Sequence, residues 1–471
     1  MVNKKYDLII IGGGAAAFAA SNTANRLKKK TLMINDSQIL PLGGTCVNVG
    51  CIPSKIMLHQ GREYYYSIHS KFSSINVKGK ADFVKALQET REMVKGFREK
   101  NYRKVIERQE YIDFKEGRAR FVDKHTVAVG DEIYKGKNIL IATGASTFVP
   151  SIDGMEHVDY LTNVSVFDLK EQPKSIVIFG GGAIAMEFSQ IFNYFGTRVT
   201  VLQRSERVLS KYDPLIGEEL RKHLETEGIK IYTGVTAKRV RKTNRGIEFE
   251  VEIKGKKGFE KIVGERLLLG LGLSPHTDID ANKVGVELDQ KGFVKVNEYM
   301  QTSQKHIYAA GDVNGLMHLE TVAAKQGSNA ARNMFENARK TINYNEIPSA
   351  VFTSPEVAVV GVTEDEYMKK YKTCLCRTVT LDHIEKAGVI KDTRGVIKMV
   401  IDHKTNQVIG VHIIAPMAAD IITIATYAIK NKMTIDDIRD TVHVFPTMSE
   451  MVKKAAQSFT QSLDDMACCV E

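Results

Sequence analysis

A glycine-rich pattern that occurs twice limits what this chain can fold into. In each copy an apolar strand leads into a glycine turn, then a helix and a second strand, over residues 8–34 and again over 176–202. Glycine permits the tight turn and lets a pyrophosphate approach the amides at the helix N-terminus. Two copies in this context predict two dinucleotide-binding folds. The turn residues expected to face the nucleotides are Gly12, Gly14, Ala17, Gly180 and Gly182.

Length and hydropathy indicate a chain of several domains without a membrane span. With 471 residues it is too long for one core, and domains of about 150 residues suggest about three. No cleavage site precedes the first glycine turn, so we expect no signal peptide and a cytoplasmic location. The apolar stretch 411–429 is interrupted by His412, Pro416 and Asp420, which predicts a buried strand followed by a helix.

The net charge of +10 is spread over the chain. Its densest lysine runs, 28–30 and 254–257, are short and lie near expected turns, which favours a solvated surface over a nucleic-acid site. In a reducing compartment, the six cysteines favour chemistry over structural disulfides.

Two of these cysteines follow the first nucleotide pattern. Cys46 and Cys51 are five positions apart and can close a small disulfide ring, with Gly50 leaving the backbone room to bend. Their position predicts a redox pair beside a bound cofactor. The segment 43–55, GGTCVNVGCIPSK, resembles the flavoprotein disulfide reductases, whose pattern G-G-T-C-x-N-x-G-C-x-P-S-K it matches at every fixed position.

The resemblance covers essentially the whole chain and implies an α/β fold and a homodimer. The fold would have two Rossmann-like domains, for FAD and NAD(P), and a C-terminal α+β dimerisation domain. The implied boundaries are 1–150 with 271–345 for FAD, 151–270 for NADPH, and 346–471 for dimerisation.

The resemblance also implies individual FAD contacts. Asn35 stands where the family usually has an acidic residue for the adenosine ribose, and Asp312 matches the ribitol-binding aspartate. Lys55 matches the lysine beside flavin N5, and Glu187 its glutamate partner; a positive charge there stabilises the reduced flavin. Further contacts are expected at Gly44, Thr45, Thr143 and Gly144.

The second fold favours NADPH over NADH. After its second strand the chain has Gln203, with Arg204 and Arg207 close behind, where an NADH enzyme would have a carboxylate. A 2′-phosphate is bound by the planar donors of arginine and repelled by a carboxylate. The alternative is that one arginine only forms a salt bridge with Glu206.

The C-terminal region departs from the disulfide reductases. Their His-Pro-Thr-x-x-Glu motif, in which histidine protonates the departing thiolate and glutamate orients it, here begins with Phe445 and ends with Glu450. His443 lies two residues earlier and should not substitute without a backbone shift. Phenylalanine cannot transfer protons, so we expect ordinary disulfide exchange to be impaired.

Cys468 and Cys469 form a vicinal pair at the C-terminus. Adjacent cysteines make poor structural disulfides but good dithiol ligands for soft metals. The mercuric reductases of the family combine such a tail with the redox pair and no histidine base, and Tyr160 matches a tyrosine near their metal site. Thr447 replaces another of their tyrosines. Cys374 and Cys376 have no further cysteine or histidine nearby, so we interpret them as structural thiols.

The resulting hypothesis is an FAD-dependent, NADPH-driven mercury(II) reductase. Hg(II), carried in by small thiols, would be collected by Cys468 and Cys469 and handed to Cys46 and Cys51. One alternative is a thiol-disulfide reductase, like dihydrolipoamide dehydrogenase, with an unusual proton donor. Another is a non-catalytic flavin-bound redox sensor.

Overall fold

The computed structural model describes residues 2–465, which form two compact units. The first unit contains the residues up to 56, together with 85–148 and 272–342. The second contains 57–84, 149–271 and the residues from 343 on. The finer division into three domains, with its boundaries, stays a prediction. The expected α/β class is confirmed.

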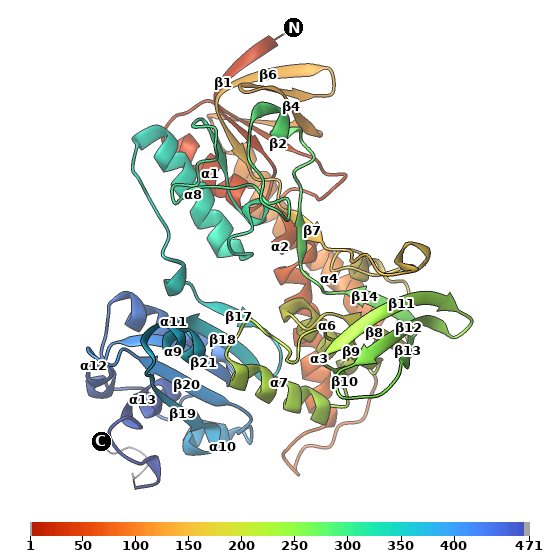
Figure 1. Cartoon of the computed structure of the whole chain (residues 1–471), viewed down its shortest axis with the longest axis vertical. Coiled ribbons are helices and arrows are strands. Elements are labelled where there is room, and N and C mark those ends of the chain that lie inside the picture. The colour runs from red at the N-terminus through yellow and green to blue at the C-terminus, as the bar shows by residue number, and fades with distance from the viewer. Residues whose placement is uncertain (1, 466–471) are drawn as a thin grey trace. The chain divides into compact units, whose positions relative to one another are not determined.

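A seven-stranded sheet forms the centre of the first unit. Its order is β3-β2-β1-β6-β5-β4, and β16 pairs with β6. The strands next to β1 run parallel to it, which explains why its apolar residues 8–11 are buried on both faces. Helices α1 and α8 lie side by side in this unit (Figure 1). The elements are β1 (Val2–Ile11), α1 (Ala15–Arg26), β2 (Thr31–Asn35), α2 (Gly44–Val49), α4 (Phe83–Arg98), α5 (Lys104–Glu107), β3 (Ile112–Glu116), β4 (Ala119–Asp123), β5 (Thr126–Val129), β6 (Glu132–Ile141), β7 (Ala145–Thr147), β15 (Leu273–Pro275), β16 (Ile307–Ala309) and α8 (Glu320–Glu336). Helix α3 (Cys51–Ile68) begins in this unit.

The second unit contains the second glycine pattern on a smaller parallel sheet. Its order is β10-β9-β8-β14, and a separate antiparallel sheet has the order β11-β12-β13. The elements are β8 (Ser175–Phe179), α6 (Ala183–Tyr194), β9 (Arg198–Leu202), α7 (Pro214–Thr226), β10 (Lys230–Tyr232), β11 (Val235–Thr243), β12 (Gly246–Ile253), β13 (Glu260–Gly264) and β14 (Arg266–Leu269). Both expected strand–turn–helix–strand repeats are therefore present.

The remainder of the second unit is an antiparallel sheet of order β17-β18-β21-β20-β19 with helices packed on it. The expected strand and helix of 411–429 are confirmed as β21 (Val408–Ala415) and α11 (Ala418–Lys430), separated by Pro416. The other elements are β17 (Ser349–Val351), β18 (Glu356–Gly361), α9 (Glu364–Tyr371), β19 (Leu375–Thr380), α10 (Glu385–Val389), β20 (Val396–Ile401), α12 (Ile435–Asp440) and α13 (Glu450–Gln457).

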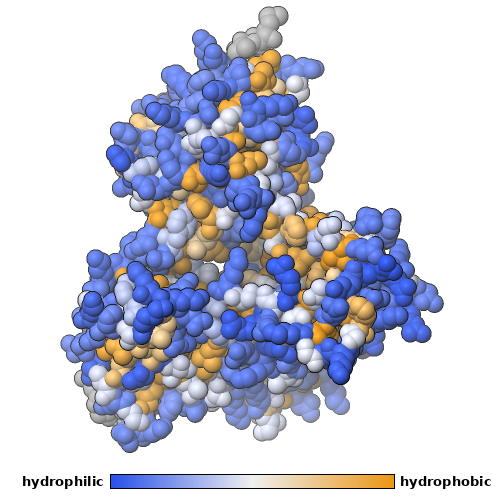
Figure 2. Space-filling model, in the orientation of Figure 1, coloured by the Kyte–Doolittle hydropathy of each residue, from blue (hydrophilic) through white to orange (hydrophobic). Residues whose placement is uncertain are grey.

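The surface is predominantly polar on the face seen in Figure 2, where hydrophobic residues occur in scattered groups. Lysines of the run 254–257 lie in ion pairs, Lys254 with Glu206 and Lys256 with Glu260 at 3.2 Å. Within residues 2–465, no helix is both long enough and apolar enough to cross a bilayer.

Candidate active site

The two cysteines of the motif lie on either side of a break between two helices. Cys46 is in α2 and Cys51 is the first residue of α3. A Cβ atom on Gly50 would lie 2.9 Å from the carbonyl oxygen of Thr45, so only glycine allows this sharp turn. Both cysteines are in the reduced thiol form and hydrogen-bond to each other; Cys46 is half-buried and Cys51 exposed. The arrangement brings the predicted redox pair together.

Asn48 holds this segment in place. Its Nδ2 donates to the carbonyl oxygens of Pro41, Leu42 and Gly44 at 3.0, 3.2 and 2.8 Å. Its Oδ1 accepts from Arg98 at 3.0 Å. Asn48 is buried and all of these hydrogen bonds are formed. Together they fix the position of α2, the helix that carries Cys46.

Two residues that the sequence did not predict lie beside Cys46. The Cys46 thiol hydrogen-bonds to Glu320, the first residue of α8, and the Tyr102 hydroxyl lies 3.5 Å from the same carboxylate. Burial raises the pKa of Glu320. The hydrogen bond to Cys51, burial and the nearby negative charges raise the pKa of the Cys46 thiol. A glutamate in a helix's first turn is so common that no sequence signal marks it as functional.

The first glycine turn forms a cradle for a dinucleotide. Gly12 has φ +128°, and a Cβ on it would lie 2.1 Å from the carbonyl oxygen of Ala142. A Cβ on Gly44 would lie 2.8 Å from the Cα of Gly14, so the cysteine segment passes directly over the turn. No side chain caps the N-terminus of α1, which leaves its amides available to a pyrophosphate. These features fit the FAD that the resemblance implies.

The other predicted FAD residues considered next belong to the same unit as this cradle. Asn35 ends β2, where its Nδ2 donates to Ser37 Oγ and to the Leu40 carbonyl, both at 3.2 Å. Thr143 Oγ1 donates to the His276 carbonyl at 2.6 Å, and Asp312 Oδ1 lies 3.5 Å from His318 Nδ1. Of the remaining ones, Ala17 is buried in α1, Thr45 is in α2, Gly144 has φ +72° and Lys55 is in α3.

The second glycine turn repeats the geometry of the first. Gly180 has φ +127°, and a Cβ added to it would lie 2.2 Å from the Gly270 carbonyl oxygen. A Cβ added to Gly12 would meet the Ala142 carbonyl oxygen in the same way. Gln203 packs against Gly181 as Asn35 packs against Gly13. Gly182 precedes α6, whose N-terminus is also uncapped by a side chain. This cradle fits a second dinucleotide.

The residues after β9 carry positive charge. Arg204 is exposed and Arg207 half-buried, and the Arg207 carbonyl accepts from Gln203 Nε2 at 3.2 Å. Glu206 forms its ion pair with Lys254 rather than with either arginine. The buried residue directly after β9 is therefore the neutral Gln203, and two arginines follow it in the chain.

Several predicted site residues belong to the second unit, whereas the cysteine motif belongs to the first. Glu187 is buried in α6 and accepts from the Phe352 amide at 3.0 Å, whereas Lys55 belongs to the first unit, so their pairing stays a prediction. Tyr160 is half-buried against the core of the β11–β13 region. Cys468 and Cys469 lie outside the described residues.

The Phe445–Glu450 segment precedes and begins α13. Glu450 is the first residue of this helix; it is buried, its Oε2 accepts from the Thr447 amide at 3.3 Å, and burial raises its pKa. Phe445 is 45% exposed, and His443 Nδ1 lies 3.0 Å from the Thr441 carbonyl oxygen. The segment thus presents an apolar ring at the position of the family's histidine.

Known proteins resemble this chain over nearly its whole length. Residues 6–327 match the family described as pyridine nucleotide-disulphide oxidoreductase, and 347–456 match the dimerisation domain of that family. The chain is 37% identical over 469 residues to a mercuric reductase of Bacillus cereus, covering 99% of this chain and 73% of that protein. It is 32% identical over 459 residues to a dihydrolipoyl dehydrogenase of Mycoplasma genitalium, covering 95% and 97%. A solved Cu(II) complex of the HOCl-induced flavoprotein disulfide reductase RclA from Escherichia coli superposes with a TM-score of 0.86 at 26% identity, covering 97% of this chain and 100% of that one.

Proposed function

Because this chain belongs to the pyridine nucleotide-disulphide oxidoreductase family, we propose that it is a mercury(II) reductase that uses FAD and NADPH. Membership of the family makes it an oxidoreductase and implies FAD and a pyridine nucleotide. The likeness to mercuric reductases over nearly the whole chain supports Hg(II) as the acceptor. The matched dimerisation domain supports a homodimer, which we propose acts in the cytoplasm on thiol-bound Hg(II).

The proposed cofactors fit the two cradles. Gly12, Gly14 and Gly44 leave room for FAD, and Gly180 and Gly182 for NADPH, each at an uncapped helix N-terminus. When bound, FAD would supply two-electron transfer, first from one NADPH to the Cys46–Cys51 disulfide and then from a second NADPH to the Hg(II) held by the two thiolates, which leaves as Hg(0). The neutral Gln203 with Arg204 and Arg207 supports NADPH over NADH, because guanidinium groups bind a 2′-phosphate and no carboxylate repels it.

Each cysteine has a proposed role. By the family resemblance, Cys51 would be the thiol that receives electrons from bound FAD, while Cys46 would exchange with incoming Hg(II). Cys468 and Cys469 of one subunit would deliver the metal to the redox pair of the other. Transfer of Hg(II) between thiolates breaks one metal–sulfur bond as another forms, so no strong base is required at each step.

The observation that carries the proposal is the apolar Phe445 side chain in place of the histidine base. A disulfide substrate must have its leaving thiolate protonated, and phenylalanine cannot supply a proton. A metal-dithiolate substrate has no such requirement. The loss of the base therefore impairs disulfide turnover more than metal reduction.

The decisive experiment measures NADPH oxidation by the purified dimer with Hg(II) under excess small thiol, alongside lipoamide and glutathione disulfide. We expect rapid oxidation with Hg(II) and release of Hg(0), which falls in Cys468→Ala/Cys469→Ala when thiol is limiting. Rapid turnover of a disulfide, with Hg(II) acting only as an inhibitor, would reject the proposal.

One observation favours a second candidate, a thiol-disulfide reductase. Glu320, with its raised pKa and its hydrogen bond to Cys46, is a carboxyl group that could supply the missing proton. This candidate predicts disulfide turnover that Glu320→Gln abolishes and Phe445→His increases. If Hg(II) is the substrate, Glu320→Gln should leave most of the mercury-dependent rate.

A further inference from the structure

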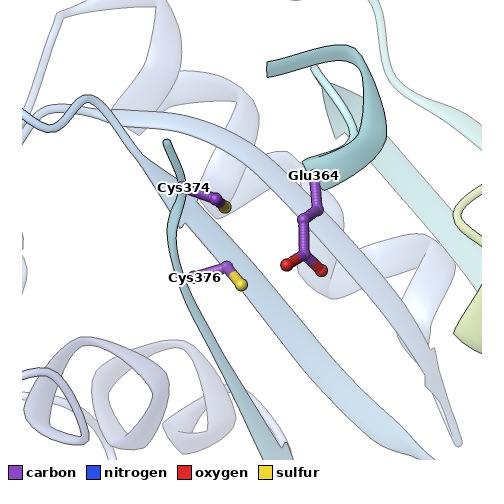
Figure 3. A group of neighbouring side chains, drawn as sticks. All are labelled: Glu364, Cys374 and Cys376. Carbon is purple, nitrogen blue, oxygen red and sulfur yellow. The ribbon is translucent and has the colours of Figure 1, made fainter. Parts of the chain in front are cut away.

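A cluster of two thiols and one carboxylate lies on the antiparallel sheet of the second unit, within the region matched to the dimerisation domain. Glu364 is the first residue of α9, Cys374 immediately precedes β19 and Cys376 is the second residue of that strand. Residues two apart in extended chain point to the same side. Figure 3 shows both cysteine side chains directed toward Glu364.

The donor atoms are close enough to share one ion. The two sulfurs and a Glu364 carboxylate oxygen all lie within 4.8 Å of one another. Two sulfurs bound to one zinc ion are at most about 4.6 Å apart, twice a Zn–S bond of about 2.3 Å. Small side-chain rotations would therefore bring all three donors to bonding distance.

The surrounding charges favour a cation. Lys398 on β20 pairs with Glu364 and also with Asp213 Oδ2 at 3.0 Å. The negative charge of the fully buried Asp213 side chain offsets the positive charge of the Lys398 ammonium group. The carboxylate of Glu364 is therefore left as excess negative charge. Because both thiols release their protons on binding, a divalent cation replaces two protons and leaves the net charge of the cluster unchanged.

The cluster is also accessible. The Glu364 side chain is 34% exposed, and both cysteines are only half-buried. An ion could enter from solvent, and a water molecule could complete four-fold coordination.

We propose that Cys374, Cys376 and Glu364 form a second binding site for a thiophilic divalent cation such as Zn(II), separate from the redox pair. The ligands are two thiolate sulfurs, each of which loses its proton to water, and one carboxylate oxygen. Two thiolates and an oxygen suit a borderline-soft ion. Structural thiols were expected here because no other cysteine or histidine lies nearby in the sequence; the third donor comes from the preceding helix instead.

The test uses the full chain with its other four cysteines removed, as Cys46→Ser/Cys51→Ser/Cys468→Ser/Cys469→Ser, reduced and loaded with FAD. Cd(II) serves as the probe, since its bonds to thiolate absorb in the ultraviolet. We expect one Cd(II) per chain, displaced by Zn(II), and loss of this binding when Cys374→Ser/Cys376→Ser is added. Equal Cd(II) absorption with and without these two cysteines would overturn the proposal.

Glu364→Gln tests the third ligand. We expect the affinity for Zn(II) to fall by about tenfold or more, the loss typical when a metal site is perturbed. Asp365→Asn is the matched control, because it removes the same charge from an exposed residue in the same helical turn. If both variants lower the affinity equally, the carboxylate of Glu364 is not a ligand and the three-donor site is wrong.

A second measurement covers the case in which the cysteine-poor background does not fold. In the otherwise unmodified dimer, bound Zn(II) is counted by competition with a chromophoric chelator. Cys374→Ser/Cys376→Ser should lower the count by one ion per chain. An unchanged count would reject the site, whatever the redox pair and the tail bind.

Discussion

The Cys46 thiol donates a hydrogen bond to Glu320, a partly buried carboxyl group at the start of α8. The negative charge of this carboxylate is one of the causes that raise the pKa of the thiol, after the bond to Cys51 and burial. Glu320 therefore disfavours the thiolate form of Cys46.

Removing the charge of Glu320 should make Cys46 more reactive. In Glu320→Gln the thiolate is no longer opposed by a nearby negative charge, so alkylation of the reduced protein by iodoacetamide at neutral pH should accelerate by roughly 3- to 10-fold, up to about one pKa unit. The measurement is the pH profile of alkylation at Cys46, read by mass spectrometry. Glu336→Gln, at the other end of α8, should leave the profile unchanged.

The same carboxyl group should make stability depend on pH. Burial raises the pKa of Glu320 in the folded protein, so the folded state binds more protons than the unfolded chain just above the ordinary glutamate value. The stability that Glu320 contributes is fully present below the ordinary pKa of glutamate. It is lost as the pH rises through the raised pKa of the folded protein. Denaturant unfolding at several pH values should show Glu320→Gln gaining stability relative to wild type as pH rises. A difference that is constant with pH would contradict this assignment.

Substitutions of two glycines in the second turn should have different effects, one on the stability of the fold and the other on nucleotide binding. Gly180→Ala places a Cβ 2.2 Å from a carbonyl oxygen at φ +127°, so the second unit should lose about 1–3 kcal/mol or more of stability. A Cβ on Gly182 meets no atom within 4 Å in extended backbone, so Gly182→Ala should fold normally. It should nevertheless weaken NADPH binding by about tenfold or more, measured by NADPH fluorescence, because the methyl group occupies the approach to the amides.

Preference for NADPH should depend on the two arginines after β9. Arg204→Ala/Arg207→Ala should lower kcat/KM for NADPH by about 10- to 100-fold, the loss expected for one charge-assisted hydrogen bond of about 1.5–3 kcal/mol. The value for NADH should change little. Arg198→Ala, an exposed arginine at the other end of the same strand, is the control. Equal losses with both nucleotides would mean that the arginines do not recognise the 2′-phosphate.

The most strongly connected arginine of the second unit should be essential for its stability. Arg394 pairs with Asp392 at 2.7 Å and with Glu227 at 3.2 Å, and it donates to the Tyr66 hydroxyl at 2.7 Å. Arg394→Met leaves buried carboxylates without their partner and should cost about 3–5 kcal/mol in urea unfolding. Arg439→Met, which breaks a surface pair with Asp436, should cost about 1 kcal/mol or less.

The sequence alone determined those helices, strands and turns that depend on the residue types within a short segment. Glycine where the backbone must turn at positive φ, and apolar runs buried on both faces of parallel strands, predicted both cradles and the order strand, turn, helix and strand. The Cys46–Cys51 motif is equally local, because Gly50 alone permits the break between its helices. Each of these features depends on the type of residue at a few adjacent positions, so a sequence pattern expresses it directly.

Only the tertiary structure decided which distant charged groups meet. Glu320 reaches Cys46 because α8 packs beside α1 in the first unit, and Glu364 meets two cysteines because α9 begins beside β19. Neither glutamate differs in its sequence context from an ordinary residue at a helix start. Burial and proximity change the chemistry of a carboxyl group, and both arise only when segments far apart in the chain, or on different elements, are packed together.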